Sequence, residues 1–145
     1  MLKVSCRLSA AAADSPPEHI RLGKAGERAA AAFLKQRGFT IIETNWRQGR
    51  LELDLVCRHG AELVFVEVKT RRSQRYGGPA AGMTAAKIRN LSRAALAWLA
   101  ARRAWNLPCR FDVLCLVSQG DAFNVEHFPH AFDLSQALDS GHTPW

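Results

Sequence analysis

The feature that most constrains the fold is the run LVFVEVKT at residues 63–70, in which apolar residues lead into two opposite charges. An uninterrupted run of β-branched and aromatic residues is typical of a central strand buried on both faces. Side chains alternate along a strand, so Glu67 and Lys69 share one face, about 7 Å apart. Charges at the end of such a strand are costly unless solvated, paired or bound to a metal. The run therefore predicts either a surface ion pair or half of a catalytic site.

The segments around this run predict a mixed α/β chain. Helices are expected over residues 24–37, where Gly38 is a stop signal, and over residues 84–103, where Thr84 is the N-cap. The expected strands are residues 39–46, 51–58, 63–70, 110–117 and 122–128. The second helix is long enough to join the third strand to a parallel fourth strand. We therefore expect a mixed sheet flanked by helices.

The length of 145 residues favours one domain. We place that domain at residues 20–130, with a disordered tail over residues 1–19 and an irregular tail over residues 131–145. No apolar stretch approaches the roughly 20 residues that span a bilayer, so we expect no membrane association. The four cysteines have no zinc-like spacing and suit a reducing cytoplasm.

The positive charge is concentrated in one segment. The net charge is +7, yet residues 69–103 contain nine Lys or Arg and no Asp or Glu. This distribution predicts a polyanionic partner, although a solvated basic helix and loop remain the alternative. The candidate phosphate contacts are Arg71, Arg72 and Arg75 beyond the strand, with Lys87 and Arg93 on the following helix.

The turn before the central strand decides whether a second carboxylate joins Glu67. In an antiparallel hairpin, directly opposed side chains lie on the same face. A two- or four-residue loop centred on Gly60 and Ala61 places Asp54 opposite Glu67, with Cβ atoms about 5 Å apart. A three-residue loop sends Asp54 to the other face. Two carboxylates at that distance repel unless one is protonated or a cation lies between them.

The residue types suit metal-assisted phosphodiester cleavage. Carboxylate oxygens of Asp54 and Glu67 fit Mg²⁺ or Mn²⁺, and the carbonyl of Val68 is a candidate further ligand. Such a metal polarises a phosphate and lowers the pKa of a water. Lys69 could orient or deprotonate that water, or neutralise the developing charge. By spacing alone this pattern is weak, because Asp and Glu-x-Lys occur often by chance.

Four segments together resemble a known family. They are KAGERAA at residues 24–30, LELDLV at 51–56, VFVEVKTR at 64–71 and RFDV at 110–113. The chain is similar over residues 22–117 to the YraN family of uncharacterised bacterial proteins. That family is assigned to the PD-(D/E)XK nuclease superfamily, which has the restriction-endonuclease-like fold, and is similar to archaeal Holliday junction resolvases. One departure is Leu51, which stands where the family usually has glycine.

The resemblance implies a fold and a set of roles. The implied fold is an α-β-β-β-α-β core. Asp54 and Glu67 would be metal ligands, Lys69 the catalytic lysine and Glu27 a helix carboxylate that faces the site. From the residues alone, Glu27 is equally a first-turn carboxylate that complements the helix dipole. Glu52 matches the family pattern too, as an accessory carboxylate or a solvated one.

Our leading hypothesis is a metal-dependent endonuclease that hydrolyses phosphodiester bonds in DNA, with branched or structured DNA included, and that uses Mg²⁺ or Mn²⁺. The alternative is a nucleic-acid-binding module of the same fold with little or no turnover. A protein-interaction domain with a basic face is the third hypothesis. DNA is favoured over RNA, and whether a homodimer forms is left open.

Overall fold

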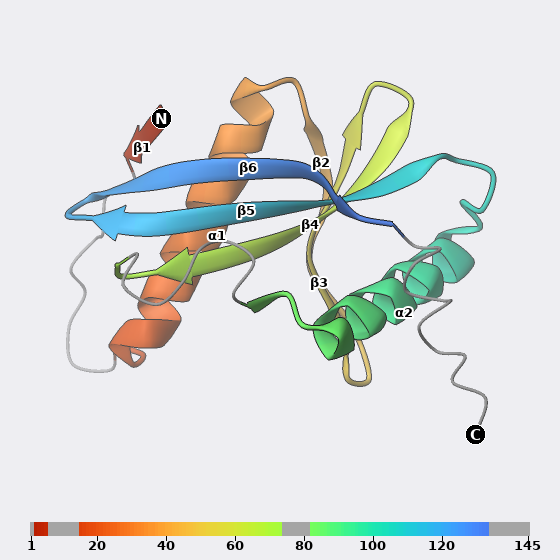
Figure 1. The fold of residues 1–145 in the computed structure, drawn as a ribbon, viewed down its shortest axis with the longest axis horizontal. Coiled ribbons are helices and arrows are strands. Elements are labelled where there is room, and N and C mark those ends of the chain that lie inside the picture. Colours follow the sequence, from red (N-terminus) through yellow and green to blue (C-terminus); the bar gives the residue numbers. More distant parts are fainter. Residues whose placement is uncertain (1, 6–14, 74–81, 134–145) are drawn as a thin grey trace.

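The structure, a computed structural model, describes residues 2–5, 15–73 and 82–133. Its elements, in chain order, are β1 (Leu2–Ser5), α1 (Glu18–Gln36), β2 (Thr40–Gln48), β3 (Leu51–His59), β4 (Glu62–Arg71), α2 (Ala85–Arg102), β5 (Cys109–Gln119) and β6 (Ala122–Phe132) (Figure 1). From α1 to β5 this is the α-β-β-β-α-β order expected from the sequence, with one further strand at each end.

The strands form one mixed sheet in the order β1-β6-β5-β4-β3-β2. Among the strands of the described residues, only β4 and β5 run parallel, and α2 lies on the connection between them. β4 lies between β5 and β3, and its residues Leu63 to Glu67 are buried. The prediction of a central strand buried on both faces, followed by a crossover to a parallel strand, is therefore confirmed.

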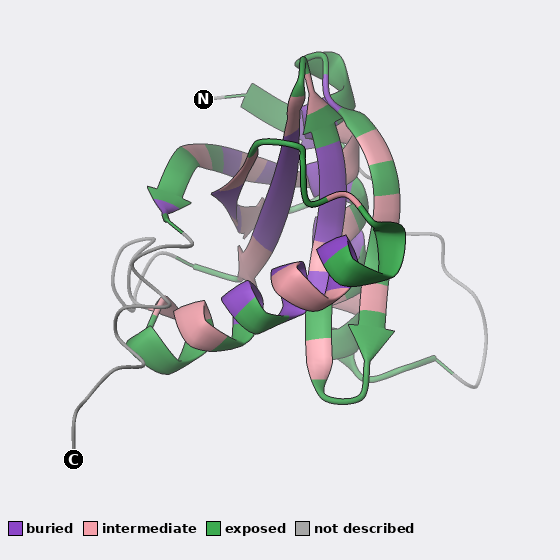
Figure 2. Cartoon of the chain, turned by 90° about the vertical axis from the view of Figure 1, so that its right-hand side faces the viewer, coloured by how far each residue is buried: buried purple, intermediate pink, exposed green. Residues whose placement is uncertain are grey.

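The two helices pack against two separate apolar clusters, which lie on opposite faces of β4. The Ala-rich face of α1 packs with Val64 and Val66, whereas α2 packs with Leu63 and Phe65. Buried residues accordingly run along the central strands and the inner sides of the helices (Figure 2). Because side chains alternate along β4, Glu67 lies on the α2 face.

α1 approaches β4 closely at a glycine. A methyl group added to Gly26 would overlap the hydroxyl oxygen of Thr70 and would lie 2.8 Å from its Cγ2. Only a residue without a side chain allows this approach of the helix to the strand. Gly26 therefore sets the distance between α1 and the carboxyl end of β4.

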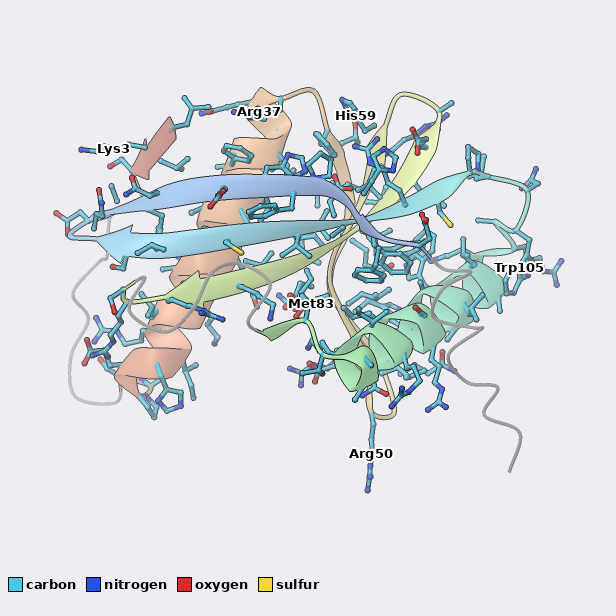
Figure 3. All side chains as sticks on the ribbon, in the orientation of Figure 1. Lys3, Arg37, Arg50, His59, Met83 and Trp105 are labelled. Atoms are coloured by element: carbon cyan, nitrogen blue, oxygen red, sulfur yellow. The ribbon has the colours of Figure 1, made fainter. Side chains whose placement is uncertain are left out.

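A half-buried carboxylate acceptor in β2, Glu43, ties α2 to that strand. The indole Nε1 of Trp98 and a guanidinium nitrogen of Arg102 both donate to Oε2 of Glu43, each at 2.7 Å. A register shift in β2 between Ile41 and Glu43 accompanies this arrangement. These contacts hold α2 over the β2–β3 hairpin, whose tip carries Arg50 away from the protein (Figure 3).

Asp112 is a buried charge that has its own partners away from the end of β4. Its carboxylate accepts hydrogen bonds from Arg110 at 3.1 Å and from the backbone N–H of His130 at 3.1 Å. His127 Nε2 lies 2.8 Å from the second carboxylate oxygen. The Asp112 carboxylate is therefore fully engaged within the β5–β6 pair and has a structural role.

The N-terminal segment, the start of α1 and the end of β6 differ from the sequence expectation. The predicted disordered tail over residues 1–19 is wrong for Leu2–Ser5, which pairs with β6 and buries Val4. α1 begins at Glu18 and not at residue 24, because its first turns still pack Leu22 against the sheet. At the other end, β6 continues to Phe132, past the expected residue 128.

None of the described helices is long and apolar enough to cross a membrane.

Candidate metal-binding site at the end of β4

The β3–β4 hairpin has the register on which the site hypothesis depends. His59 pairs with Glu62 across the two-residue turn, and Leu55 pairs with Val66 at the other end of the ladder. Continued by one residue, this register places Asp54 opposite Glu67. The pairing of β3 with β4 ends at Leu55 and Val66, while β3 stays paired with β2 down to Leu51.

Asp54 occupies the point where β3 and β4 separate. The backbone N–H of Val68 donates to Oδ2 of Asp54 at 2.8 Å. The carboxylate thus takes the hydrogen bond that a continued ladder would have given to the β3 backbone. A carboxylate at position 54 stabilises this arrangement, because it accepts from the Val68 N–H, which would otherwise lack an acceptor in β3.

Asp54 is held in an environment that disfavours its charge. Burial, together with the neighbouring Glu67 carboxylate, raises the pKa of Asp54 from 3.8 to about 7. The hydrogen bond from Val68 and the charge of Lys87 act in the opposite direction but do not outweigh those effects. Near neutral pH the binding of a proton or a metal cation relieves the repulsion between the two carboxylates.

Glu67 is almost buried and carries an ion pair. Its side chain is 10% exposed, and its Oε1 lies 3.1 Å from the Nζ of Lys87 in α2. Burial alone would lower the pKa of Lys87, but the Glu67 carboxylate raises it above its usual value. The alternative considered from the sequence was a surface ion pair between Glu67 and Lys69; in the structure Glu67 pairs with Lys87 of α2.

Lys69 lies on the same face, beyond Glu67, and its ammonium is packed against the chain that leads into α2. Burial lowers the pKa of Lys69, and the nearby charge of Glu67 only partly offsets this effect. A methyl group added to Gly82 would overlap Nζ of Lys69 and lie 3.3 Å from its Cε. The absence of a side chain at Gly82 therefore provides the space for the lysine.

Replacing Gly82 with alanine is expected to move the Lys69 ammonium out towards water. Because the atom that must move is the tip of a flexible side chain, the protein should keep its melting temperature to within about 2 °C. Loss of burial should raise the pKa of Lys69 towards 10.5. NMR titration of ¹³C-labelled lysine measures this shift, and Gly23→Ala, where a methyl group meets no atom within 4 Å, is the control. An unchanged Lys69 titration in Gly82→Ala would contradict the role of Gly82.

The oxygen atoms at this point fit a small hard cation. Asp54 and Glu67 supply two carboxylates that cannot both be charged without compensation. In a strand, the N–H and C=O of one residue point to the same side, so the Val68 carbonyl faces the gap that its N–H faces. The described residues contain no group of three or more His, Cys, Asp or Glu that could hold a metal. Two carboxylates suit Mg²⁺, which retains several waters, better than zinc.

Glu27 does not sit in the first turn of a helix, because α1 begins at Glu18. It is half-buried and lines a cavity of about 610 Å³ with Asn45 and Leu55, among others. No hydrogen bond or ion pair between described residues joins Glu27 to Asp54 or Glu67. The role of Glu27 as a carboxylate that faces the site stays a prediction.

The basic candidates are divided among different surroundings. Arg71 ends β4, and Arg72 forms an ion pair of 2.9 Å with Glu18 in which both side chains are largely exposed. Such a pair is weak, so Arg72 can exchange its partner for a phosphate. Arg93 is exposed on α2, whereas Arg75 lies outside the described residues.

Sequence reasoning missed the part that Lys87 plays, since it treated this residue only as a phosphate contact. The available signal was its position in the first turn of α2, a turn with no acidic residue. A cation there is unfavourable for the helix dipole and needs a carboxylate nearby.

In a comparison with known protein families, residues 26–116 match the family described as "Uncharacterised protein family UPF0102". The UPF0102 protein of Nitratidesulfovibrio vulgaris is 47% identical over 123 residues, which cover 85% of this chain and 92% of that protein. The UPF0102 protein of Lawsonia intracellularis is 41% identical over 124 residues, covering 86% and 94% respectively.

Among solved structures, one similar chain is described as "The structure of Pyrococcus Furiosus SfsA in complex with Ca2+". The two chains are 15% identical with a TM-score of 0.35, and the match covers 77% of this chain and 63% of that one. This likeness is too weak to carry an argument about the site.

Proposed function

This chain belongs to the UPF0102 (YraN) family of uncharacterised bacterial proteins, and on that premise we propose that it is a Mg²⁺- or Mn²⁺-dependent endonuclease that hydrolyses phosphodiester bonds in DNA, including branched or structured DNA. One observation supports the proposal above the others. The half-buried carboxylate of Asp54 and the buried carboxylate of Glu67 lie close together at the point where β3 leaves β4, on the face that also carries Lys69. A binding module for a polyanion has no need of such a pair.

Each residue has a role in this proposal. Asp54 and Glu67, with the carbonyl of Val68, would hold the metal. The bound metal would polarise the scissile phosphate and lower the pKa of the attacking water. Lys69, whose pKa is lowered by burial, gives up its proton more readily than an exposed lysine and so can accept one from that water. Its cationic form would stabilise the negative charge that develops on the phosphate.

The basic surface supplies the substrate affinity in this account. In the sequence, Arg71, Arg72 and Arg75 come after the last strand residue of the site, and Arg93 is exposed on α2. Phosphate contacts release counterions, so the logarithm of DNA affinity should fall linearly with the logarithm of salt concentration. A slope near zero would favour a protein partner over a nucleic acid.

The second candidate function is nucleic-acid binding with little or no turnover. One observation favours it: Lys87 already compensates the charge of Glu67 without any metal. Salt-dependent binding cannot separate the two candidates, because both predict it. Only cleavage does so.

The test is cleavage of linear, nicked, flapped and four-way DNA with Mg²⁺ or Mn²⁺. The wild-type protein should cut at least one substrate, and Glu67→Ala and Lys69→Ala should each lose at least about 100-fold in rate. Glu126→Ala, which removes an exposed carboxylate from β6, is the matched control and should cut normally. Activity that survives both site substitutions would point to a different site or a contaminant, and no cleavage by the wild type would favour the second candidate.

A further inference from the structure

The ion pair between Lys87 and Glu67 joins two elements at the mouth of the candidate site. Lys87 Nζ lies 3.1 Å from Glu67 Oε1; the Glu67 side chain is 10% exposed and that of Lys87 45% exposed. The carboxylate is therefore fixed in the protein, while the lysine reaches it from solvent through a flexible stem. A partner of this kind can leave without disturbing the fold.

Lys87 lies in the first turn of α2, where its charge is favourable only because of the contact with Glu67. The helix begins after the N-cap Thr84, whose hydroxyl accepts from the N–H of Lys87 at 3.1 Å. A cation in the first helical turn faces the positive end of the helix dipole, which disfavours it. Compensation comes from Glu67, with smaller contributions from the charges of Asp54 and Glu52.

Lys69 does not take this role, although it lies on the same face of β4. Its ammonium is packed against Gly82 and forms no ion pair with a described carboxylate. The two lysines thus divide the work of the site. Lys69 packs against Gly82 near Glu67, whereas Lys87 forms the ion pair with Glu67.

We propose that Lys87 is a resident counter-cation of the Glu67 carboxylate, which a divalent cation must displace in order to bind, so that Lys87 sets the metal affinity of the site. This inference rests on the proposed metal site. Lys87 and the metal compete for the Glu67 carboxylate, so the ion pair between Lys87 and Glu67 is lost when the metal binds. Removal of the lysine charge therefore strengthens metal binding, the reverse of what loss of a ligand does.

The test is a titration of the metal-free protein with Mn²⁺, measured by calorimetry at pH 8.5. At this pH a proton is less able to neutralise Glu67 in place of the missing lysine. Lys87→Gln should bind Mn²⁺ about 2- to 5-fold more tightly than the wild type, which is what loss of a competing ion pair with a solvent-exposed lysine amounts to. Lys87→Arg keeps the charge and should bind no more tightly than the wild type. Arg93→Gln removes the same charge from an exposed position on the same helix and should change the affinity less than about twofold.

The outcomes separate this inference from the proposed function. If the wild type binds Mn²⁺ and Lys87→Gln binds it equally or more weakly, the counter-cation role is overturned and the metal site stands. If Arg93→Gln tightens binding as much as Lys87→Gln, the effect is one of overall charge and the role is likewise overturned. If the wild type does not bind Mn²⁺, the metal site itself is overturned together with this inference.

Discussion

Lys69→Met is expected to reduce metal-dependent DNA cleavage by about 10²- to 10⁴-fold, the range for a residue that transfers a proton or stabilises charge in the transition state. Methionine keeps the length of the apolar stem up to Cε and removes only the ammonium that packs against Gly82. Burial already disfavours the charge of Lys69, and its loss should leave the melting temperature unchanged or slightly raised. Rates at saturating DNA and metal measure the effect.

The control for Lys69→Met is Lys35→Met, which removes an exposed lysine from the last turn of α1. Its cleavage rate should equal that of the wild type. DNA affinity at fixed salt should stay within about threefold for Lys69→Met, because one phosphate contact contributes little to a multi-contact interface. A Lys69→Met protein that cuts DNA at the wild-type rate would remove Lys69 from the mechanism.

Asp54→Asn is expected to abolish cleavage and, at the same time, to stabilise the metal-free protein at pH 8. A carboxyl whose pKa is raised in the folded state stabilises that state at low pH, and this stability is lost as the pH rises from about 4 to about 7. Asparagine carries no charge, and its side-chain oxygen still accepts the hydrogen bond from Val68. The gain should be about 1–3 kcal/mol in the free energy of unfolding, or about 3–10 °C in Tm.

The pH dependence gives the Asp54→Asn prediction its sharpest form. Thermal unfolding in EDTA should show a difference between the two proteins that is small at pH 4 and grows to a plateau above pH 7. Addition of Mn²⁺ should then raise the Tm of the wild type alone, since the variant lacks a ligand. A variant that is less stable than the wild type at pH 8 would mean that the Asp54 charge is well accommodated without a metal.

The parts of the site that were predictable from the sequence belong to one hairpin, β3–β4, or to neighbouring residues in the chain. The apolar run of residues 63–66 identified the buried strand, and the short turn at Gly60 and Ala61 left a small number of registers. One of these placed Asp54 opposite Glu67, which is the register in the structure. The start of α2 at the N-cap Thr84 was also predictable, because an N-cap hydrogen bond joins residues that are close in the sequence.

The parts that were not predictable depend on contacts between distant segments. The four residues Leu2–Ser5 contain no pattern from which their pairing with the edge of β6 could be predicted. The contact of Lys69 with Gly82 and the pair of Lys87 with Glu67 depend on where α2 begins relative to the end of β4. Single-residue patterns carry no information on such distances, and only the packing of the crossover helix on the sheet decides them.

The most direct test of the metal site is calorimetric titration of Mn²⁺ into three proteins at pH 8: the wild type, Asp54→Asn and Glu67→Gln. The account predicts one site in the wild type and a loss of affinity of at least about 30-fold in each variant, because each removes one of two charged ligands. Equal Mn²⁺ affinity in all three proteins, or no Mn²⁺ binding by the wild type, would contradict it.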